Sequence, residues 1–329
     1  MNPVPPAASL HPALTVTKPG ANLFRRPGVR NRRHIDWLRM MRFRLAFLAA
    51  IVLLWCGRGN AQEIMYFPSL EDNGPGAPST TLEGYLFRPP GSGKHPALVF
   101  LHGCDGLFNR GTGLIGRRER DWAAELTRRG YVVLMVDSFG PRNHGEMCSQ
   151  RGFDRELYLK RPRDAYGALL LLQAQPFVQP DRVGVIGWSQ GGGAVLFEIG
   201  AATGPRPAPL QQGDFRAAVA FYPASCDDRR QPNWNTHIPL LALLGAEDVW
   251  TPAVPCKIFL DGAMSRGAHI EVQVYPGAYH GFDRADSPRR ELPEFRTAAG
   301  IIPIVGTDPA ARQDALSRVP IFLERFLMN

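Results

Sequence analysis

Short runs of apolar residues alternate along this chain with longer segments of mixed, helix-compatible character. Residues 131–136 are apolar at every position, which is typical of a strand buried on both faces of a sheet. Alternation of such strands with helices predicts an α/β fold, with a mostly parallel central sheet and helices on both faces. We expect strands at 82–87, 97–101, 131–136, 183–186, 217–222, 240–244 and 270–275, and helices at 119–129, 163–173, 194–201, 257–266 and 310–326.

The connecting segments predict an open site. Pro162 fits the first turn of the helix expected at 163–173, where a proline is well tolerated. Residues 203–213 are rich in proline and glycine and indicate a loop or a shortened cap. No segment is long enough to form a large lid domain, so we expect little to cover the site.

The first 61 residues have the pattern of an export signal. Residues 41–44 carry two arginines, residues 45–55 are apolar, and residues 59–61 are small or polar, as before a cleavage site. We therefore expect a signal peptide at 41–61, cleavage before Gln62, and an exported protein, either periplasmic or secreted. Residues 1–40 show no apolar periodicity and indicate either a start codon assigned too early or a disordered extension.

This leader also changes the reading of charge and of membrane attachment. It holds ten of the 38 Lys and Arg residues and one of the 30 acidic residues, which leaves 28 basic and 29 acidic groups in residues 62–329. The remainder is close to neutral, so we expect no nucleic-acid partner. The apolar run of the leader, residues 45–55, has eleven residues, fewer than the ~20 that span a bilayer. A retained membrane anchor is therefore the less favoured alternative. Residues 62–329 suit a single α/β domain.

Four cysteines follow the leader: Cys104, Cys148, Cys226 and Cys256. An even number in an exported chain favours disulfides, and three pairings are possible. Cys104 and Cys148 follow consecutive strands, as do Cys226 and Cys256, and neighbouring loops can bring Cα atoms within the ~4.4–6.8 Å that a bridge needs. We favour Cys104–Cys148 and Cys226–Cys256. No Cys-x-x-Cys pair or His-rich cluster supports a metal site, and no cofactor is implied.

The strand at 183–186 runs directly into a serine motif. Residues 187–191 read Gly-Trp-Ser-Gln-Gly, and a helix-compatible segment follows at once. This is a Gly-x-Ser-x-Gly nucleophile elbow in the strand–turn–helix context that it requires. Side chains two residues before or after the strained serine would collide with neighbouring elements, which explains the glycines. Ser189 is therefore the candidate nucleophile, and we expect Trp188 to pack against the sheet.

A serine nucleophile needs a base, and three histidines follow Ser189 in the sequence. His237 and His269 stand where strands begin, whereas sites in α/β folds form at the carboxyl ends of strands. His280 lies on a loop beyond the carboxyl end of the strand at 270–275. His280 is therefore the candidate base.

The acid of such a triad is expected to follow the strand at 240–244, since the order in this fold is serine, acid, histidine. Asp248 is the first choice, and Glu247 is the alternative. Each residue alone would read as an ordinary loop residue. Their order at successive strand ends is what predicts a triad.

Two backbone N–H groups should stabilise the oxyanion that forms when serine attacks a carbonyl. One is that of Gln190, the residue after the nucleophile. The other belongs to the loop at 102–106, most suitably to Cys104, and His102 in that loop is expected to be structural.

Together these motifs resemble the dienelactone hydrolase family of α/β-hydrolases, and more closely its exported branch, over roughly residues 64–328. The resemblance rests on the segments 101–106, 137–142, 187–192, 245–248 and 279–284. It implies an α/β-hydrolase fold and a serine hydrolase that cleaves a small-molecule ester or lactone through an acyl-enzyme. In the enzymes that give the family its name the nucleophile is cysteine, whereas this chain has Ser189.

Two arginines of that family hold the carboxylate of the substrate, and Arg142 and Arg284 stand at the matching positions. The resemblance thus implies an anionic substrate. The alternative for each arginine is a structural ion pair, which Asp283 beside Arg284 favours. The alternatives for the whole chain are an acyltransferase or peptidase on the same fold, or a catalytically silent binding protein, although no member of the triad is missing.

Overall fold

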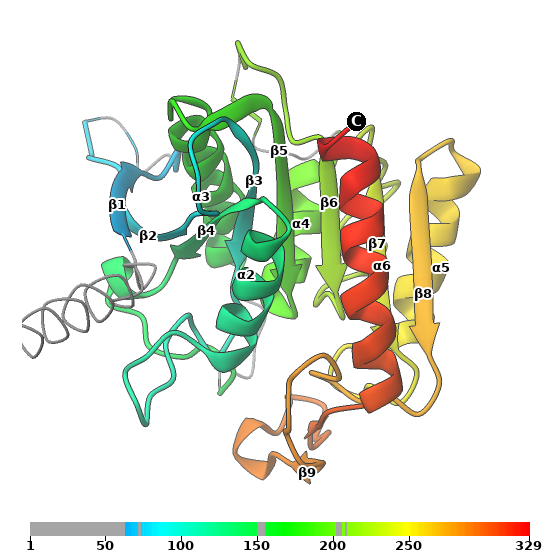
Figure 1. The fold of residues 1–329 in the computed structure, drawn as a ribbon. Helices are drawn as coiled ribbons and strands as arrows, with labels where there is room; N and C mark the ends of the chain where they lie inside the picture. Colours follow the sequence, from blue (N-terminus) through cyan, green and yellow to red (C-terminus); the bar gives the residue numbers. More distant parts are fainter. Residues whose placement is uncertain (1–62, 72–73, 75, 150–154, 202–205, 208) are drawn as a thin grey trace, which may run out of the picture. The chain divides into compact units, whose positions relative to one another are not determined.

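The computed structural model describes residues 63–329, except 72–73, 75, 150–154, 202–205 and 208. At its centre is a sheet with the strand order β1-β2-β4-β3-β5-β6-β7-β8 (Figure 1). The strands are β1 (Glu63–Pro68), β2 (Thr81–Phe87), β3 (His95–Leu101), β4 (Val132–Asp137), β5 (Val178–Trp188), β6 (Ala217–Phe221), β7 (Leu240–Gly245) and β8 (Ile270–Tyr275). Strands β3 to β8 are parallel, and β1 and β2 add an antiparallel edge next to β4. The predicted mostly parallel sheet is confirmed.

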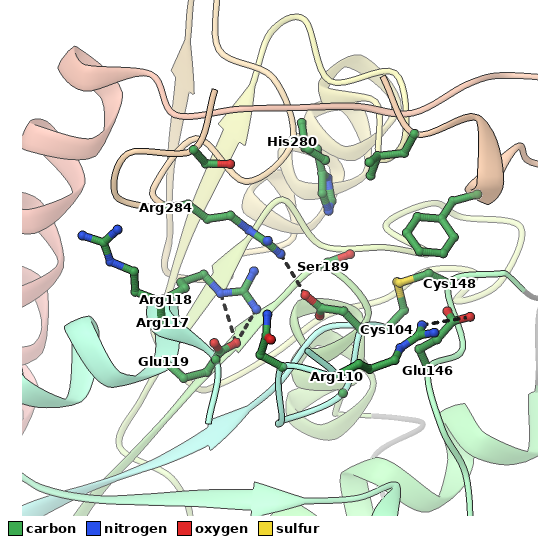
Figure 2. Close-up of a pocket in the computed structure, with 18 of the residues that line it drawn as sticks. Cys104, Arg110, Arg117, Arg118, Glu119, Glu146, Cys148, Ser189, His280 and Arg284 are labelled. Atoms are coloured by element: carbon green, nitrogen blue, oxygen red, sulfur yellow. Dashed lines mark hydrogen bonds and ion pairs between the residues drawn. A yellow bond between two sulfur atoms is a disulfide. The ribbon is translucent and has the colours of Figure 1, made fainter. Parts of the chain in front are cut away.

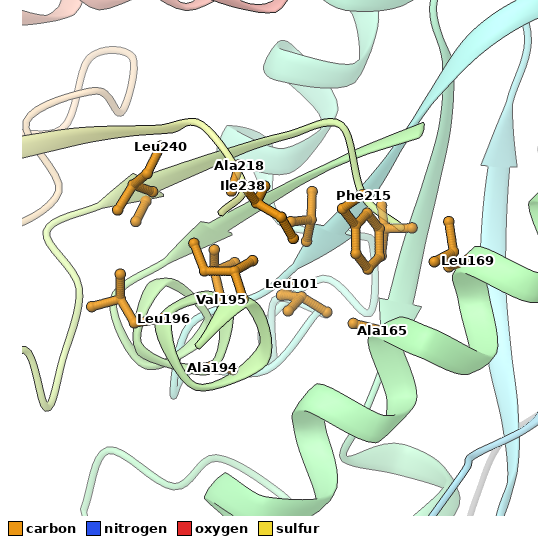
Figure 3. Close-up of a cluster of buried hydrophobic side chains, with 14 of the residues drawn as sticks. Leu101, Ala165, Leu169, Ala194, Val195, Leu196, Phe215, Ala218, Ile238 and Leu240 are labelled. Atoms are coloured by element: carbon orange, nitrogen blue, oxygen red, sulfur yellow. The ribbon is translucent and has the colours of Figure 1, made fainter. Parts of the chain in front are cut away.

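Helices cover both faces of this sheet, as predicted. The helices are α2 (Arg117–Arg128), α3 (Arg155–Gln173), α4 (Gln190–Ile199), α5 (Ala253–Ser265) and α6 (Pro309–Leu327), with short 3-10 helices η1 (Gly140–Arg142) and η2 (Pro293–Phe295). Helices α3, α4 and α5 contribute to one apolar cluster, part of which Figure 3 shows, and α2 and α6 contribute to another. Side chains of β3 alternate between them, since Val99 joins the first cluster and Phe100 the second.

The start of α3 differs from the prediction. The helix begins at Arg155 rather than at 163, so Pro162 lies in its interior rather than in its first turn. A proline there removes one helical hydrogen bond and costs about 3 kcal/mol. Tertiary contacts help to offset this cost, because the fully buried Arg161 donates to Gln190 at the start of α4 and to the carbonyl of His102 after β3.

A further addition lies between β8 and α6. Strands β9 (Arg290–Glu291) and β10 (Ile304–Val305) pair antiparallel, and η2 lies between them. Val305 also bridges to His280. Sequence reasoning predicted none of these elements, because two-residue strands carry no periodicity that a pattern can detect.

Two disulfides join the favoured cysteine pairs, Cys104–Cys148 and Cys226–Cys256. The expectations for residues 1–40, for the signal peptide at 41–61 and for a mature end at Gln62 all lie outside the described residues. No helix in the described part of the chain is both long and apolar enough to cross a membrane. The described residues belong to one compact unit, residues 60–329.

A buried carboxyl group lies on α4, the helix that follows Ser189. Glu198 is fully buried, and neither of its carboxyl oxygens has a hydrogen-bond partner among the residues that the structure describes. Burial, with the nearby Asp214 carboxylate, raises the pKa of Glu198 well above its usual value. The folded protein therefore holds this group protonated in a pH range in which the unfolded chain ionises it.

This difference predicts that Glu198 destabilises the fold increasingly as the pH rises. Stability falls above the unfolded pKa, and the loss is complete at the raised folded pKa. Glu198→Gln removes the titration, so its melting temperature should exceed that of the unmodified protein by a few degrees more at pH 8 than at pH 5. About 1 kcal/mol corresponds to about 2–4 °C in a domain of this size. Exposed Glu63→Gln is the control, and an equal shift at both pH values would contradict the prediction.

Candidate active site

A cavity of about 950 Å³ opens beside Ser189 and His280, which both line it. Its walls come from the segment between β3 and α2, from residues 146–149, and from the segment that contains β9, η2 and β10. Figure 2 shows the imidazole of His280 pointing into this space toward Ser189, with the Cys104–Cys148 disulfide at its edge. Serine and histidine therefore meet where the order of motifs predicts.

Ser189 sits in the turn between β5 and α4, with φ 53° and ψ −114°. This positive φ is uncommon for a residue other than glycine and is typical of a strained functional turn. A Cβ atom at Gly187 would collide with the backbone of Gly191, and one at Gly191 would collide with that of Leu101. The turn is fixed to β6, since the N–H of Ser189 donates to Phe221 O at 2.9 Å.

His280 is bonded to Asp248 rather than to the alternative, Glu247. Its Nδ1 lies 2.7 Å from Asp248 Oδ2, and both side chains are buried. The other oxygen, Oδ1, accepts the backbone N–H groups of Trp250 and Thr251 at 2.8 and 2.9 Å. The Thr251 hydroxyl lies 2.8 Å from Asp248 Oδ2 and 3.2 Å from His280 Nδ1. Glu247 is exposed. Asp248 is thus held in place to orient the imidazole.

No direct hydrogen bond joins Ser189 to His280 among the described contacts. Such bonds are often long in unliganded enzymes and shorten when substrate binds. Residues Ser189 and His280 are 7% and 4% exposed, and both line the cavity, so each keeps a small opening toward it.

The backbone N–H groups of Gln190 and Cys104 are the predicted oxyanion donors. In the part of the chain that the structure describes, neither donates to a protein acceptor. The guanidinium of Arg161 links both segments, because it donates to Gln190 Oε1 at 3.0 Å and to His102 O at 2.6 Å. Sequence reasoning missed Arg161, since nothing in its local sequence signals burial.

His102, the first residue of the loop that contains Cys104, is buried. Its Nε2 accepts the N–H of Ser138 at 3.3 Å, so Nδ1 carries the proton and donates to Gly103 O at 2.7 Å. Burial, together with the positive charge of Arg161, lowers the pKa of His102 to about 3. The neutral imidazole therefore fixes the loop, in keeping with the structural role expected for it.

Arg142 does not line the cavity, and the structural alternative holds for it. Its guanidinium makes two hydrogen bonds to Asp164, at 2.9 and 2.7 Å, one to Glu71 at 2.9 Å and one to Ser138 O at 2.8 Å. Burial raises the pKa of Glu71, but hydrogen bonds from Thr80 and Arg142 outweigh it and bring the value to about 2. The predicted contact of Arg142 with substrate is corrected, because Arg142 lies away from the cavity and both of its terminal nitrogens donate to protein acceptors.

Arg284 does line the cavity, but it is paired with Asp105, with Nη2 2.9 Å from Oδ2 (Figure 2). Among the residues that the structure describes, five arginines and five carboxylates line the cavity: Arg110, Arg117, Arg118, Arg284 and Arg290, with Asp105, Glu119, Glu146, Asp286 and Glu294. Ion pairs join Arg110 to Glu146, Arg117 to Asp286 and Arg118 to Glu119. The charges balance, so net charge alone does not select an anionic substrate.

One carboxylate that sequence reasoning did not single out connects several parts of the site. Asp283 is buried and accepts the indole N–H groups of Trp122 and Trp188 at 2.8 and 2.9 Å and the hydroxyl of Tyr222 at 2.5 Å. Trp188 packs against the sheet, as expected, and directly precedes Ser189. The ring of Tyr222 lies 4.4 Å from that of His280. Asp283 thus joins the serine turn to the histidine loop.

No group of three or more His, Cys, Asp or Glu side chains is placed to hold a metal ion within the described ranges. The arrangement brings together a serine hydroxyl, an imidazole and a carboxylate beside one cavity. These groups are the elements of nucleophilic acyl transfer.

Comparisons with known proteins identify the family and the fold of this chain. The sequence model of the dienelactone hydrolase family matches residues 82–327. The "Probable 2-oxo-3-(5-oxofuran-2-ylidene)propanoate lactonase" of Bradyrhizobium sp is 24% identical over 215 residues, 60% of this chain and 77% of that protein. A "Putative Dienelactone Hydrolase" from Klebsiella pneumoniae superposes with a TM-score of 0.55 at 17% identity, covering 80% of this chain and 100% of that one.

The propionate-bound esterase Est2 of Thermogutta terrifontis has the same fold, with a TM-score of 0.54 at 18% identity over 82% of this chain and 96% of that one. At these identities the two solved structures establish the fold alone. The family model spans most of the chain, including all three residues of the candidate triad. The chain therefore belongs to the dienelactone hydrolase family of the α/β-hydrolase superfamily.

Proposed function

We propose that this protein is a serine hydrolase that cleaves a small ester or lactone through a Ser189–His280–Asp248 triad. The observation that carries the proposal is the buried Asp248–His280 pair, with 2.7 Å between Oδ2 and Nδ1, beside a cavity that Ser189 also lines. The lactonase and esterase relatives make an ester bond the natural target. The strained turn at Ser189 adds support, since it presents the hydroxyl at the carboxyl end of the sheet.

The reaction proceeds in two steps. Ser189 Oγ attacks the carbonyl carbon while its proton passes to His280 Nε2, and Asp248 keeps the Nδ1 proton in place. The N–H groups of Gln190 and Cys104 stabilise the oxyanion, each by about 3 kcal/mol by analogy with measured oxyanion holes. His280 then protonates the leaving oxygen. Water, activated by the same imidazole, releases the acid from Ser189.

Of the two arginines predicted to bind an anionic substrate, Arg284 is the one that lines the cavity. A carboxylate on the substrate would take the place of Asp105 at its guanidinium, with a charge-assisted and often bidentate hydrogen bond. Arg142 has no part in this proposal, because its guanidinium is occupied by Asp164 and Glu71.

A panel of substrates tests the function. Purified residues 62–329 should hydrolyse simple esters and lactones, and the acid should form without an added alcohol acceptor. Matched esters with and without a free carboxylate should be compared by kcat/KM, and higher values for the carboxylate esters are the expected result. Cleavage of peptide reporters but not of esters would contradict the proposal. Higher values for the neutral esters would overturn the role of Arg284 while leaving the triad intact.

We also propose that the protein is exported and that residues 1–61 are removed. The two disulfides support this, since such bonds persist in oxidising compartments. Mass spectrometry of the natural protein should find Gln62 at its N-terminus. An intact leader, or cysteines that can be alkylated before reduction, would contradict export.

A further inference from the structure

Aromatic side chains continue outward from His280 along one wall of the cavity. Trp250 lies with its ring centre 5.0 Å from that of His280, and the ring of Phe295 lies 5.9 Å from Trp250 at an interplanar angle of 19°. Both Trp250 and Phe295 line the cavity and are only half-buried. Leu292 and Val305 line it beside them. The rings of Trp250 and Phe295 thus form a nearly parallel pair on this wall, although Arg290 and Glu294 of the same segment also line the cavity.

The rest of the cavity has a different character. Ion pairs formed by Arg118, Arg284 and Arg110 lie below and beside Ser189 in Figure 2. Charged groups therefore lie beside Ser189, whereas the accessible rings of Trp250 and Phe295 continue outward from His280. Large aromatic faces left accessible beside reactive groups are typical of sites that bind an apolar part of a ligand.

The chemistry of the proposed reaction decides which part of the substrate reaches the aromatic wall. His280 has to donate a proton to the leaving oxygen, so that oxygen comes within hydrogen-bond distance of the imidazole. The carbon atoms bonded to it then lie next to Trp250, whose ring packs against His280. The alcohol part of the ester therefore faces the rings.

We propose that Trp250 and Phe295 form a subsite for an aromatic alcohol group, so that the preferred substrates are benzyl-type esters. This inference rests on the proposed function. In the acylation step the ester C–O bond breaks, the acyl group bonds to Ser189 Oγ, and the aromatic alcohol leaves with the proton from His280. Water then releases the acid and restores the serine. Planar groups gain most from such a wall because aromatic rings favour offset-stacked and edge contacts.

Phe295 is the position to change, because its ring stacks on Trp250 and the residue is not itself a member of the candidate triad. The substrates are benzyl acetate, ethyl acetate and ethyl phenylacetate. The two acetates give the same acyl-enzyme, so the ratio of their kcat/KM values isolates the alcohol. Phe295→Ala should lower kcat/KM for benzyl acetate roughly tenfold and leave that for ethyl acetate within about twofold.

Two further variants complete the experiment. Phe295→Leu keeps apolar volume without a ring, and it should lose most of the benzyl preference while melting close to the unmodified protein. Phe108→Ala removes another half-buried ring that lines the cavity outside this wall, and it should leave the ratio unchanged. Equal losses on both acetates, or a loss confined to ethyl phenylacetate, would overturn the inference. Absence of turnover on every ester would instead overturn the proposed function, and this inference with it.

Discussion

Replacing Ser189 or His280 by alanine is expected to lower ester turnover by about 10⁴–10⁶-fold while the protein stays folded. The loss is large because the nucleophile and its base act as a unit, and removing either leaves only binding and the oxyanion donors. The measurement is kcat on an ester that the unmodified protein hydrolyses, together with the melting temperature of each variant.

The chain offers matched controls for both substitutions. Ser149 lines the same cavity, and His237 is exposed at the opposite edge of the sheet, so Ser149→Ala and His237→Ala should keep near-full activity. An organophosphonate should modify Ser189 and no other residue. A label on Ser149, or near-full turnover by Ser189→Ala, would show that the assigned nucleophile is wrong.

Arg142→Met is expected to destabilise the fold by about 3–5 kcal/mol. The substitution removes the guanidinium from the buried carboxyl groups of Glu71 and Asp164 and leaves the more distant Lys160, at 3.8 Å, as the cation near Glu71. The side chains of Arg142, Glu71 and Asp164 are 6%, 1% and 0% exposed, so water cannot replace the lost contacts. Urea or thermal unfolding measures the change, and the melting temperature should fall by about 10 °C or more. Adding Glu71→Gln and Asp164→Asn to the same chain should recover part of the loss.

Arg117→Met is the control for this experiment, because its ion pair with Asp286 is exposed and should contribute less than about 1 kcal/mol. The Arg142→Met protein that remains folded should show a similar change in kcat/KM, relative to the unmodified protein, for neutral and for carboxylate-bearing esters. Unchanged stability with a loss confined to the carboxylate esters would return Arg142 to the substrate-binding role that its motif suggests.

The contrast between Arg142 and Arg284 marks where sequence reasoning reaches its limit. Each of these arginines ends one of the motifs on which the family resemblance rests, 137–142 and 279–284, and each carries a guanidinium. Only one of them meets two buried acids, and those acids lie 71 and 22 residues away along the chain. A motif fixes a residue's place on a loop, whereas its partners depend on how distant segments pack.

The strands and the order of the site residues were predictable for the opposite reason. Buried parallel strands are continuous apolar runs, and each one ends at a fixed edge, so the places of Ser189, Asp248 and His280 follow from local pattern. Asp283 and Arg161 gave no such signal, because an acid or an arginine in a sequence reads as surface unless its partners are known. Strands β9 and β10 were not predicted because each has only two residues.

Asp283 has a consequence for how the cavity can change over evolution. Its three hydrogen bonds hold the turn before Ser189 and the loop of His280 together from beneath, through Trp188 and Tyr222. Residues 285–308, several of which line the cavity, follow closely after this anchor. Side-chain replacements there can change what the cavity accepts while the backbone bridge from Val305 to His280 is kept. The architecture thus separates the buried contacts that hold the reacting groups from the cavity-lining side chains that are freer to vary.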